Sequence, residues 1–219
     1  MMSVGKTFAV MVVAVLCFIF MLSGLPGRAA AVEDGFDLLV DNMKKGNKEE
    51  RIAAVEKLSG MKDERSLTAL INEFHELYED WRIRIMALDA LAASGNSMVT
   101  DALVDGSYDP CPAIKWHAVT GLGGYGNDRA ISALIDALDD STMYIRETAI
   151  ESLGRIRARE AVPYLGNALH DRNFAIRLKA TLALGRIGDE QALLLLKWET
   201  QNEKDLFIKD EAASLLINR

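Results

Sequence analysis

Apolar, small and basic positions follow one repeating pattern over most of this chain. A basic residue is followed three positions later by an alanine, and the pair recurs at intervals of 31 to 33 residues. The six copies are Arg51/Ala54, Arg84/Ala87, Lys115/Ala118, Arg146/Ala149, Arg177/Ala180 and Lys209/Ala212. Self-similarity at a fixed period of this length is typical of stacked helical units. The pattern therefore predicts a solenoid.

Each unit predicts two helices joined by a short polar turn. The first helix carries the basic residue, the alanine and a leucine ridge, which consists of Leu58, Leu91, Leu122, Leu153, Leu184 and Leu215. We expect glycines to end these helices with positive φ, at Gly60, Gly124, Gly154 and Gly185. The second helix shows apolar residues at helical spacing, as at Ile131, Leu134 and Leu138. The alanine is expected where two helices cross closely, because a larger side chain would separate the backbones.

An acidic residue precedes the basic one by six positions in four units. These acids are Asp109, Asp140, Asp171 and Glu203. Such a residue is expected to cap the first helix and to face the basic side chain of its own or the neighbouring unit. Because the acids accompany the basic residues at fixed spacing, we interpret the basic residues as structural partners and not as a polyanion-binding ladder.

Two stretches, 145–165 and 176–196, carry the repeat most clearly, and each contains Leu-Gly-Arg-Ile. They resemble the PBS-lyase-type HEAT-like repeats of the HEAT family, and the resemblance extends over residues 47–219. It implies an all-α fold, an α-solenoid wound as a right-handed superhelix of about five to six helix pairs. Residues 32–46 are expected to form an N-terminal capping helix, mainly over 36–45, because a repeat array needs a polar-faced cap. The last unit, 205–218, offers a single helix.

The N-terminal segment differs from the repeats. Lys6 precedes an apolar run from Phe8 to Leu22, and after a Gly/Pro break come three alanines that end at Ala31. This order predicts a signal peptide over residues 1–31 and a secreted protein of the bacterial periplasm. The alternative is an N-terminal membrane anchor, although the run is shorter than the roughly 20 residues that span a bilayer. We expect no stable membrane insertion after cleavage.

The net charge restricts the classes of partner, and the cysteine content leaves one candidate thiol. Removal of residues 1–31 leaves 23 of the 25 basic residues against 32 acidic ones, a net charge of −9. Such a surface repels phosphate backbones, so we expect no nucleic acid partner. Cationic proteins, peptides or metal ions remain open, and we expect a protein or peptide partner, for which the charge favours basic residues. Cys111 is then the single cysteine, in Asp109-Pro110-Cys111-Pro112. It is either a partly buried small apolar residue or a reactive thiol.

The resemblance also implies enzymes, namely bilin lyases and deoxyhypusine hydroxylase. The hydroxylase holds iron with several His-Glu pairs, and this sequence has one, His75-Glu76. We find no nucleophile–base arrangement, no phosphate-binding glycine loop and no cluster with metal-ligand spacing, so no cofactor, metal or catalytic residue is expected. The sequence favours a non-catalytic binding module. The alternative is an enzyme or enzyme subunit related to those families.

Second helices usually line the concave face of a solenoid, and the repeat aligns their exposed positions in columns. One column is Thr68, Asp101, Ser132, Pro163 and Leu194, and another is Asn72, Asp105, Asp136, Asn167 and Trp198, with Tyr164 in a neighbouring one. The face is predicted to be small and acidic at first and apolar or aromatic towards the C-terminus. It would suit an extended peptide with basic residues and one hydrophobic anchor. Alternatively, the final helix covers Leu194 and Trp198, and the acids are a solvated polar surface.

Overall fold

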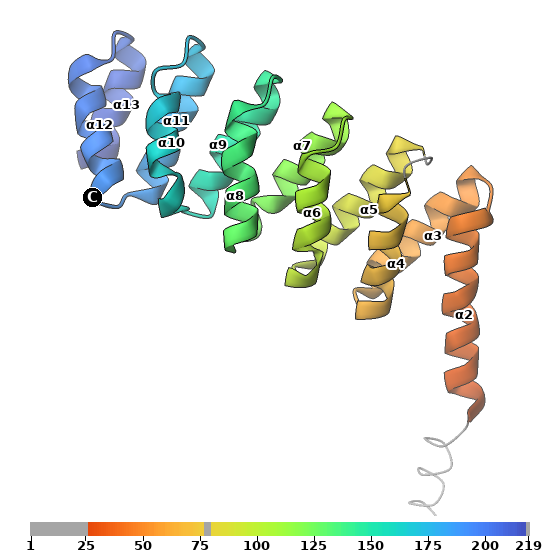
Figure 1. Cartoon of the computed structure of the whole chain (residues 1–219). Coiled ribbons are helices and arrows are strands. Elements are labelled where there is room, and N and C mark those ends of the chain that lie inside the picture. Colours follow the sequence, from red (N-terminus) through yellow and green to blue (C-terminus); the bar gives the residue numbers. More distant parts are fainter. Residues whose placement is uncertain (1–25, 77–79, 218–219) are drawn as a thin grey trace, which may run out of the picture.

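The computed structural model describes residues 26–76 and 80–217, with side chains from residue 35 onward. In this part of the chain the fold is entirely helical. The helices stack in two rows, with the second helix of each unit in the front row and the first helix behind it (Figure 1). The predicted all-α solenoid is therefore confirmed. The apolar run of the predicted signal peptide lies outside the described residues.

Within the described residues, the array consists of five helix pairs and a final single helix. The first helices are α3 (Lys48–Met61), α5 (Trp81–Ser94), α7 (Pro112–Leu122), α9 (Met143–Arg155) and α11 (Phe174–Ile187). The second helices are α4 (Glu64–His75), α6 (Thr100–Ser107), α8 (Asp128–Asp136), α10 (Val162–Ala168) and α12 (Glu190–Asn202). Short 3-10 turns precede α6 and α10 and follow α8. The last unit contributes only α13 (Leu206–Ile217).

The repeated alanines are buried between the helices of the stack. All six are at most 1% exposed, and the leucines of the ridge from Leu58 to Leu184 are completely buried. First helices of successive units pack directly against each other, as α9 does against α11. A methyl side chain lets neighbouring backbones approach, so one alanine per unit sets the spacing of the stack.

The repeated basic residues link successive units. Each is the fourth residue of its first helix, and three of them reach an acid at the start of the next unit. These pairs are Arg84–Asp109 at 2.6 Å, Lys115–Asp140 at 2.7 Å and Arg177–Glu203 at 3.1 Å. Arg146 instead donates to the carbonyl oxygen of Asp140 at 2.7 Å. This bonding to acids and carbonyls is the structural role that the sequence predicted.

The expected helix capping by the same acids is wrong. Their carboxylates accept hydrogen bonds inside the connecting turn, as Asp140 does from the backbone N–H of Thr142 at 2.7 Å. The N-cap of α11 is Asn173, whose side chain accepts from the N–H of Ala175. The acids stand two residues before the cap position, so they stabilise the turn between two units.

Two of the predicted helix-ending glycines have another role. Gly154 lies inside α9, and a Cβ there would lie 2.8 Å from the Cα of Ala183 in α11. Gly185 likewise faces Leu215 of α13. These glycines permit close packing between first helices, because any side chain would push the helices apart. Positive φ instead occurs just beyond helix ends, at Gly95 and Gly188.

The leading helix α2 runs from Pro26 to Lys45, and thus begins earlier than the expected 36–45. It packs on α3, and Met43 is completely buried there. The same helix continues through Ala31, where the sequence predicts signal cleavage. None of the helices in the described ranges combines the length and apolar character needed to cross a bilayer.

Candidate binding face on the second helices

The exposed surface of α4, α6, α8, α10 and α12 forms the second-helix face. All ten residues of the two predicted columns are exposed on it, and so is Tyr164. In α8, Ile131 and Leu134 are buried while Ser132 and Asp136 are exposed. A period of 3.6 residues separates the two sets onto opposite sides of the helix. The candidate residues thus share one face of the solenoid.

Each acid of the two predicted columns contacts a residue of an adjacent unit. Asp101 pairs with Arg129 at 2.5 Å, and Asp105 contacts Nε2 of His75 at 3.0 Å. These partners stand 28 to 30 residues away from the acids, one repeat along the chain. The sequence-based description missed them, although the repeat spacing would have suggested them. Exposed pairs of this kind contribute about 0.2 to 1 kcal/mol, so a ligand can displace them at small cost.

Asp136 has a hydroxyl partner. The Tyr108 hydroxyl donates to its carboxylate at 2.6 Å. This hydrogen bond, with partial burial and the nearby negative charge, raises the pKa of Tyr108 to about 12. Tyr108 therefore remains a neutral hydrogen-bond donor to Asp136 far above physiological pH.

Large apolar side chains gather at the C-terminal end of the face. Tyr164 is 49% exposed, Leu194 61% and Trp198 43%. The final helix α13 therefore leaves Leu194 and Trp198 accessible, and the alternative in which it covers them is wrong. His170 meets the Trp198 ring edge to face, with ring centroids 5.0 Å apart. This contact holds the indole in a defined orientation.

Cavities open beside these aromatic residues. Tyr164 and Asn167 line one of about 150 Å³ between α8 and α10, together with Ile135. Trp198 lines a second of about 350 Å³, with His170 and Glu203. A third, of about 470 Å³, lies between α2 and α4 at the other end of the array. The aromatic end thus offers recesses next to exposed rings, which suits the anchoring of a partner side chain.

A buried carboxylate, which the sequence did not indicate, lies beneath Trp198. Glu199 is 1% exposed, and no described residue offers a hydrogen-bond donor to either of its carboxylate oxygens. Burial, followed by its neighbour Glu203, raises the pKa of Glu199 to about 7. In its protonated form Glu199 can donate to Glu203, whose pKa is lowered by backbone N–H groups and Arg177 against the opposing effect of burial.

The remaining candidates show no catalytic arrangement. Cys111 is a partly buried free thiol at the N-cap of α7 and packs against the core. His75 contacts the carbonyl oxygen of Ile71 as well as Asp105, and Glu76 is the C-cap that follows α4. Among the described residues, no group of three or more His, Cys, Asp or Glu side chains could hold a metal ion.

Comparison with known proteins places the fold. The phycocyanin lyase complex of CpcE and CpcF from Nostoc matches with a TM-score of 0.58 and 20% identity, over 81% of this chain and 74% of that one. A designed armadillo repeat protein in complex with peptide (KR)4 matches with a TM-score of 0.60 and 16% identity, over 82% and 97% of the two chains. Such low identities show a common fold alone. No curated protein matches the chain.

The sequence itself matches the family of HEAT repeats in three overlapping segments. They cover residues 71–144, 100–165 and 134–217. Together these segments include most of the array, in agreement with the resemblance seen in the repeat motifs. The matched part is more than half of the chain, and the protein therefore belongs to the HEAT-repeat family.

Proposed function

We propose that the protein is an exported, non-catalytic scaffold that binds an extended segment of a protein or peptide along its second-helix face. The observation that carries this proposal is the exposure of Tyr164, Leu194 and Trp198 on the adjacent helices α10 and α12. Exposed apolar clusters next to recesses are typical of partner-binding surfaces. Burying apolar surface stabilises a protein by about 25 cal/mol per Å², and an exposed cluster gains this free energy only when a partner covers it. Aromatic residues at such sites commonly supply most of the binding energy.

The acids on the same face favour a basic partner. Asp101, Asp105 and Asp136 are exposed, and the whole chain carries a net charge of −7. A negative surface attracts cationic segments and raises their association rate at low salt. The fold-related designed protein in complex with peptide (KR)4 supports this choice of probe. The preferred ligand has basic residues towards α6 and α8 and one hydrophobic residue at α10 and α12.

Titration with a defined peptide tests this assignment. The probe is an octapeptide of alternating Lys and Arg with one Phe near an end, and its control carries Glu in place of every basic residue. We expect Trp198→Ala to weaken binding about tenfold, the loss of one aromatic anchor worth about 1.4 kcal/mol. Asn72→Ala, at the equivalent position of α4, should change affinity less than twofold.

Two results contradict the proposal. One is equal affinity for the acidic control peptide, which would remove the electrostatic basis. The other is loss of helical content or a lower melting temperature in Trp198→Ala, which would make Trp198 a structural residue. Export is tested separately by N-terminal sequencing of the natively produced protein. A start at Val32 supports cleavage of residues 1–31, whereas a start at Met1 supports a retained anchor.

A further inference from the structure

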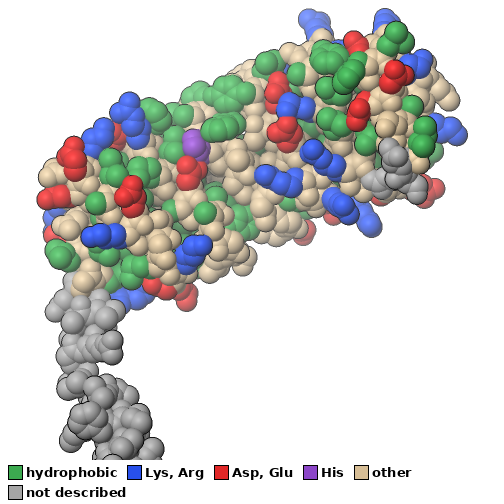
Figure 2. All heavy atoms as spheres, turned by 180° about the vertical axis from the view of Figure 1, so that it is seen from behind, with side chains coloured by type: hydrophobic (Ala, Val, Ile, Leu, Met, Phe, Trp, Pro, Cys, Tyr) green, Lys and Arg blue, Asp and Glu red, His purple; other side chains and the backbone are tan. Residues whose placement is uncertain are grey.

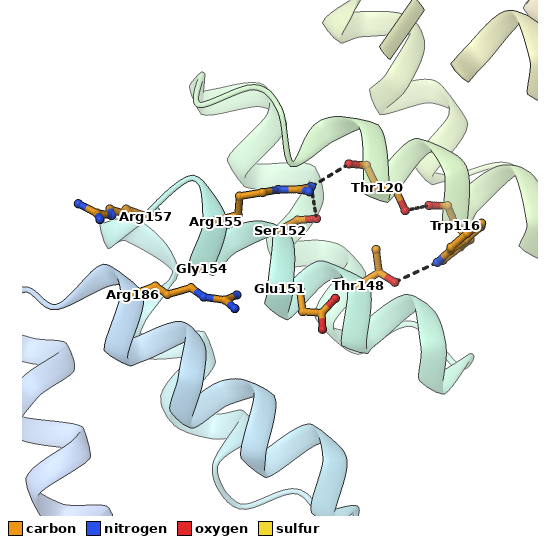
Figure 3. Close-up of a pocket in the computed structure, with 9 residues that line it drawn as sticks. All are labelled: Trp116, Thr120, Thr148, Glu151, Ser152, Gly154, Arg155, Arg157 and Arg186. Atoms are coloured by element: carbon orange, nitrogen blue, oxygen red, sulfur yellow. Dashed lines mark hydrogen bonds between the residues drawn. The ribbon is translucent and has the colours of Figure 1, made fainter. Parts of the chain in front are cut away.

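A cavity of about 670 Å³ opens on the opposite side of the solenoid, between the first helices α7, α9 and α11. Its lining includes Trp116, Thr148, Glu151, Arg155, Arg157 and Arg186 (Figure 3). Figure 2 views this side and shows Lys and Arg side chains along its length, with several over the middle and C-terminal helices and acidic side chains among them. The cavity is independent of the second-helix face, so it can be occupied at the same time.

Charge distinguishes this cavity from the rest of the protein. Three guanidinium groups line it against one carboxylate, and that carboxylate, Glu151, pairs with Lys179. Arg155 is held in place, because it donates to the carbonyl oxygens of Gly123 and Thr120 at 3.1 Å each. Within the described residues, the exposed guanidinium groups of Arg157 and Arg186 donate no hydrogen bond and form no ion pair. They are free to bind an anion.

The backbone at Arg157, just beyond the end of α9, makes a substitution that separates binding from packing possible. Its φ is 54°, in the left-handed region that glycine adopts most readily. One repeat further on, the equivalent residue is Gly188, with φ 61°. An arginine at such a position costs conformational free energy that glycine would not, and its side chain is exposed. Lys62 has the same conformation at the end of α3, so the left-handed φ belongs to a helix end, and the case for Arg157 as a ligand-binding residue is its place in the cavity.

We propose that this cavity binds the carboxylate groups of an acidic peptide segment. Arg157 and Arg186 supply planar guanidinium groups, which pair with carboxylates through two parallel hydrogen bonds. Trp116 is 40% exposed at the other end of the cavity, and its Nε1–H donates to Thr148 Oγ1 at 3.1 Å. This hydrogen bond orients the indole, which offers an apolar surface. The preferred ligand therefore carries an aliphatic or aromatic residue beside its acids.

Trp116 serves as the reporter in the test. Replacing Trp81 and Trp198 by Phe leaves it as the single tryptophan. The probe is the end-blocked peptide Glu-Glu-Leu-Glu-Glu, and its control carries Gln at every Glu. We expect a saturable change in fluorescence with the acidic peptide alone, and a Kd at least tenfold higher in Arg186→Gln. An equal response to the Gln peptide, or displacement of the peptide by equimolar inorganic phosphate, would overturn the proposal.

Arg157→Gly separates binding from structure. Glycine relieves the cost of positive φ, so the melting temperature should stay the same or rise while the Kd for the acidic peptide increases at least tenfold. Lys62→Gly is the matched control, because Lys62 has φ 55° at the end of α3. It should also preserve or raise the melting temperature and leave the Kd unchanged. Unchanged binding in Arg157→Gly, or a lowered melting temperature, contradicts the assignment.

Discussion

The first and last helix pairs each have a buried glutamate at the same repeat position, but the two glutamates differ in their ion-pair partners. Glu73 in α4 and Glu199 in α12 are each 1% exposed. Glu73 forms an ion pair with Arg51 of α3, with Nη2 and Oε1 2.6 Å apart. Arg177 of α11, the repeat equivalent of Arg51, is instead bonded to Glu203 at 3.1 Å. The middle pairs have glycine or alanine at this position, as at Gly106, Ala137 and Ala168.

The difference shows that the protonation of a buried glutamate depends on its neighbours, and not on its position in the repeat alone. A buried carboxylate is tolerated when a cation compensates it, and otherwise it takes up a proton. At the C-terminal end, Arg177 forms its ion pair with Glu203 and not with Glu199. Burial, followed by the neighbouring Glu203 carboxylate, therefore raises the pKa of Glu199 to about 7. The same residue type is thus part of an ion pair at one end and a proton-binding group at the other.

The largest effect is expected from Glu73→Gln. The substitution removes the charged carboxylate that pairs with the mostly buried side chain of Arg51 at 2.6 Å. Breaking a buried pair by removing one partner costs about 3 kcal/mol. Urea unfolding followed by circular dichroism measures the change. Glu76→Gln, at the exposed end of the same helix, is the control and should have little effect; a loss below about 1 kcal/mol in Glu73→Gln would count against a stabilising pair.

Glu199→Gln should act in the opposite direction and depend on pH. The pKa of Glu199 is raised from 4.5 to about 7 in the folded protein, so the folded state binds this proton more tightly than the unfolded state does. The resulting contribution to the free energy of unfolding is fully present below pH 4.5. That stabilisation is lost as the pH rises towards 7. We expect the Gln variant to gain about 2 kcal/mol over the natural protein at pH 8 and little at pH 5. Urea unfolding at the two pH values measures it, and an equal difference at both would be inconsistent with titration of Glu199.

Glu203→Gln should produce the smallest change in stability at neutral pH. It removes the carboxylate that pairs with Arg177. Arg177 could then pair with Glu199, in the way that Arg51 pairs with Glu73 at the other end. The two consequences oppose each other, so we expect a net change below about 1 kcal/mol. The pKa of Glu199 should fall, because the neighbouring negative charge is gone. NMR titration of the Glu199 carboxyl carbon measures this, and an unchanged pKa would refute the proposed coupling.

Sequence-based prediction was most successful for features that depend on the residue spacing within a single helix. The buried alanines, the leucine ridge and the exposed columns from Thr68 to Trp198 follow from helical periodicity, which each helix carries by itself. At Gly154 the predicted position near a helix end is right, one residue before the end of α9, but the expected positive φ is wrong. Its function depends on the approach of Ala183 from the next unit, and no local pattern reports that distance.

The sequence by itself determined the repeat, the two-helix unit, the family and the side of each second helix that faces solvent, because these depend on spacing along the chain. Only the tertiary structure decided which groups share a neighbourhood. It brought Arg129 to Asp101, Arg157 and Arg186 to one cavity, and Glu203 to the arginine that Glu199 lacks. Charge pairing and proton affinity depend on distances across units, and stacking of the helices creates those distances.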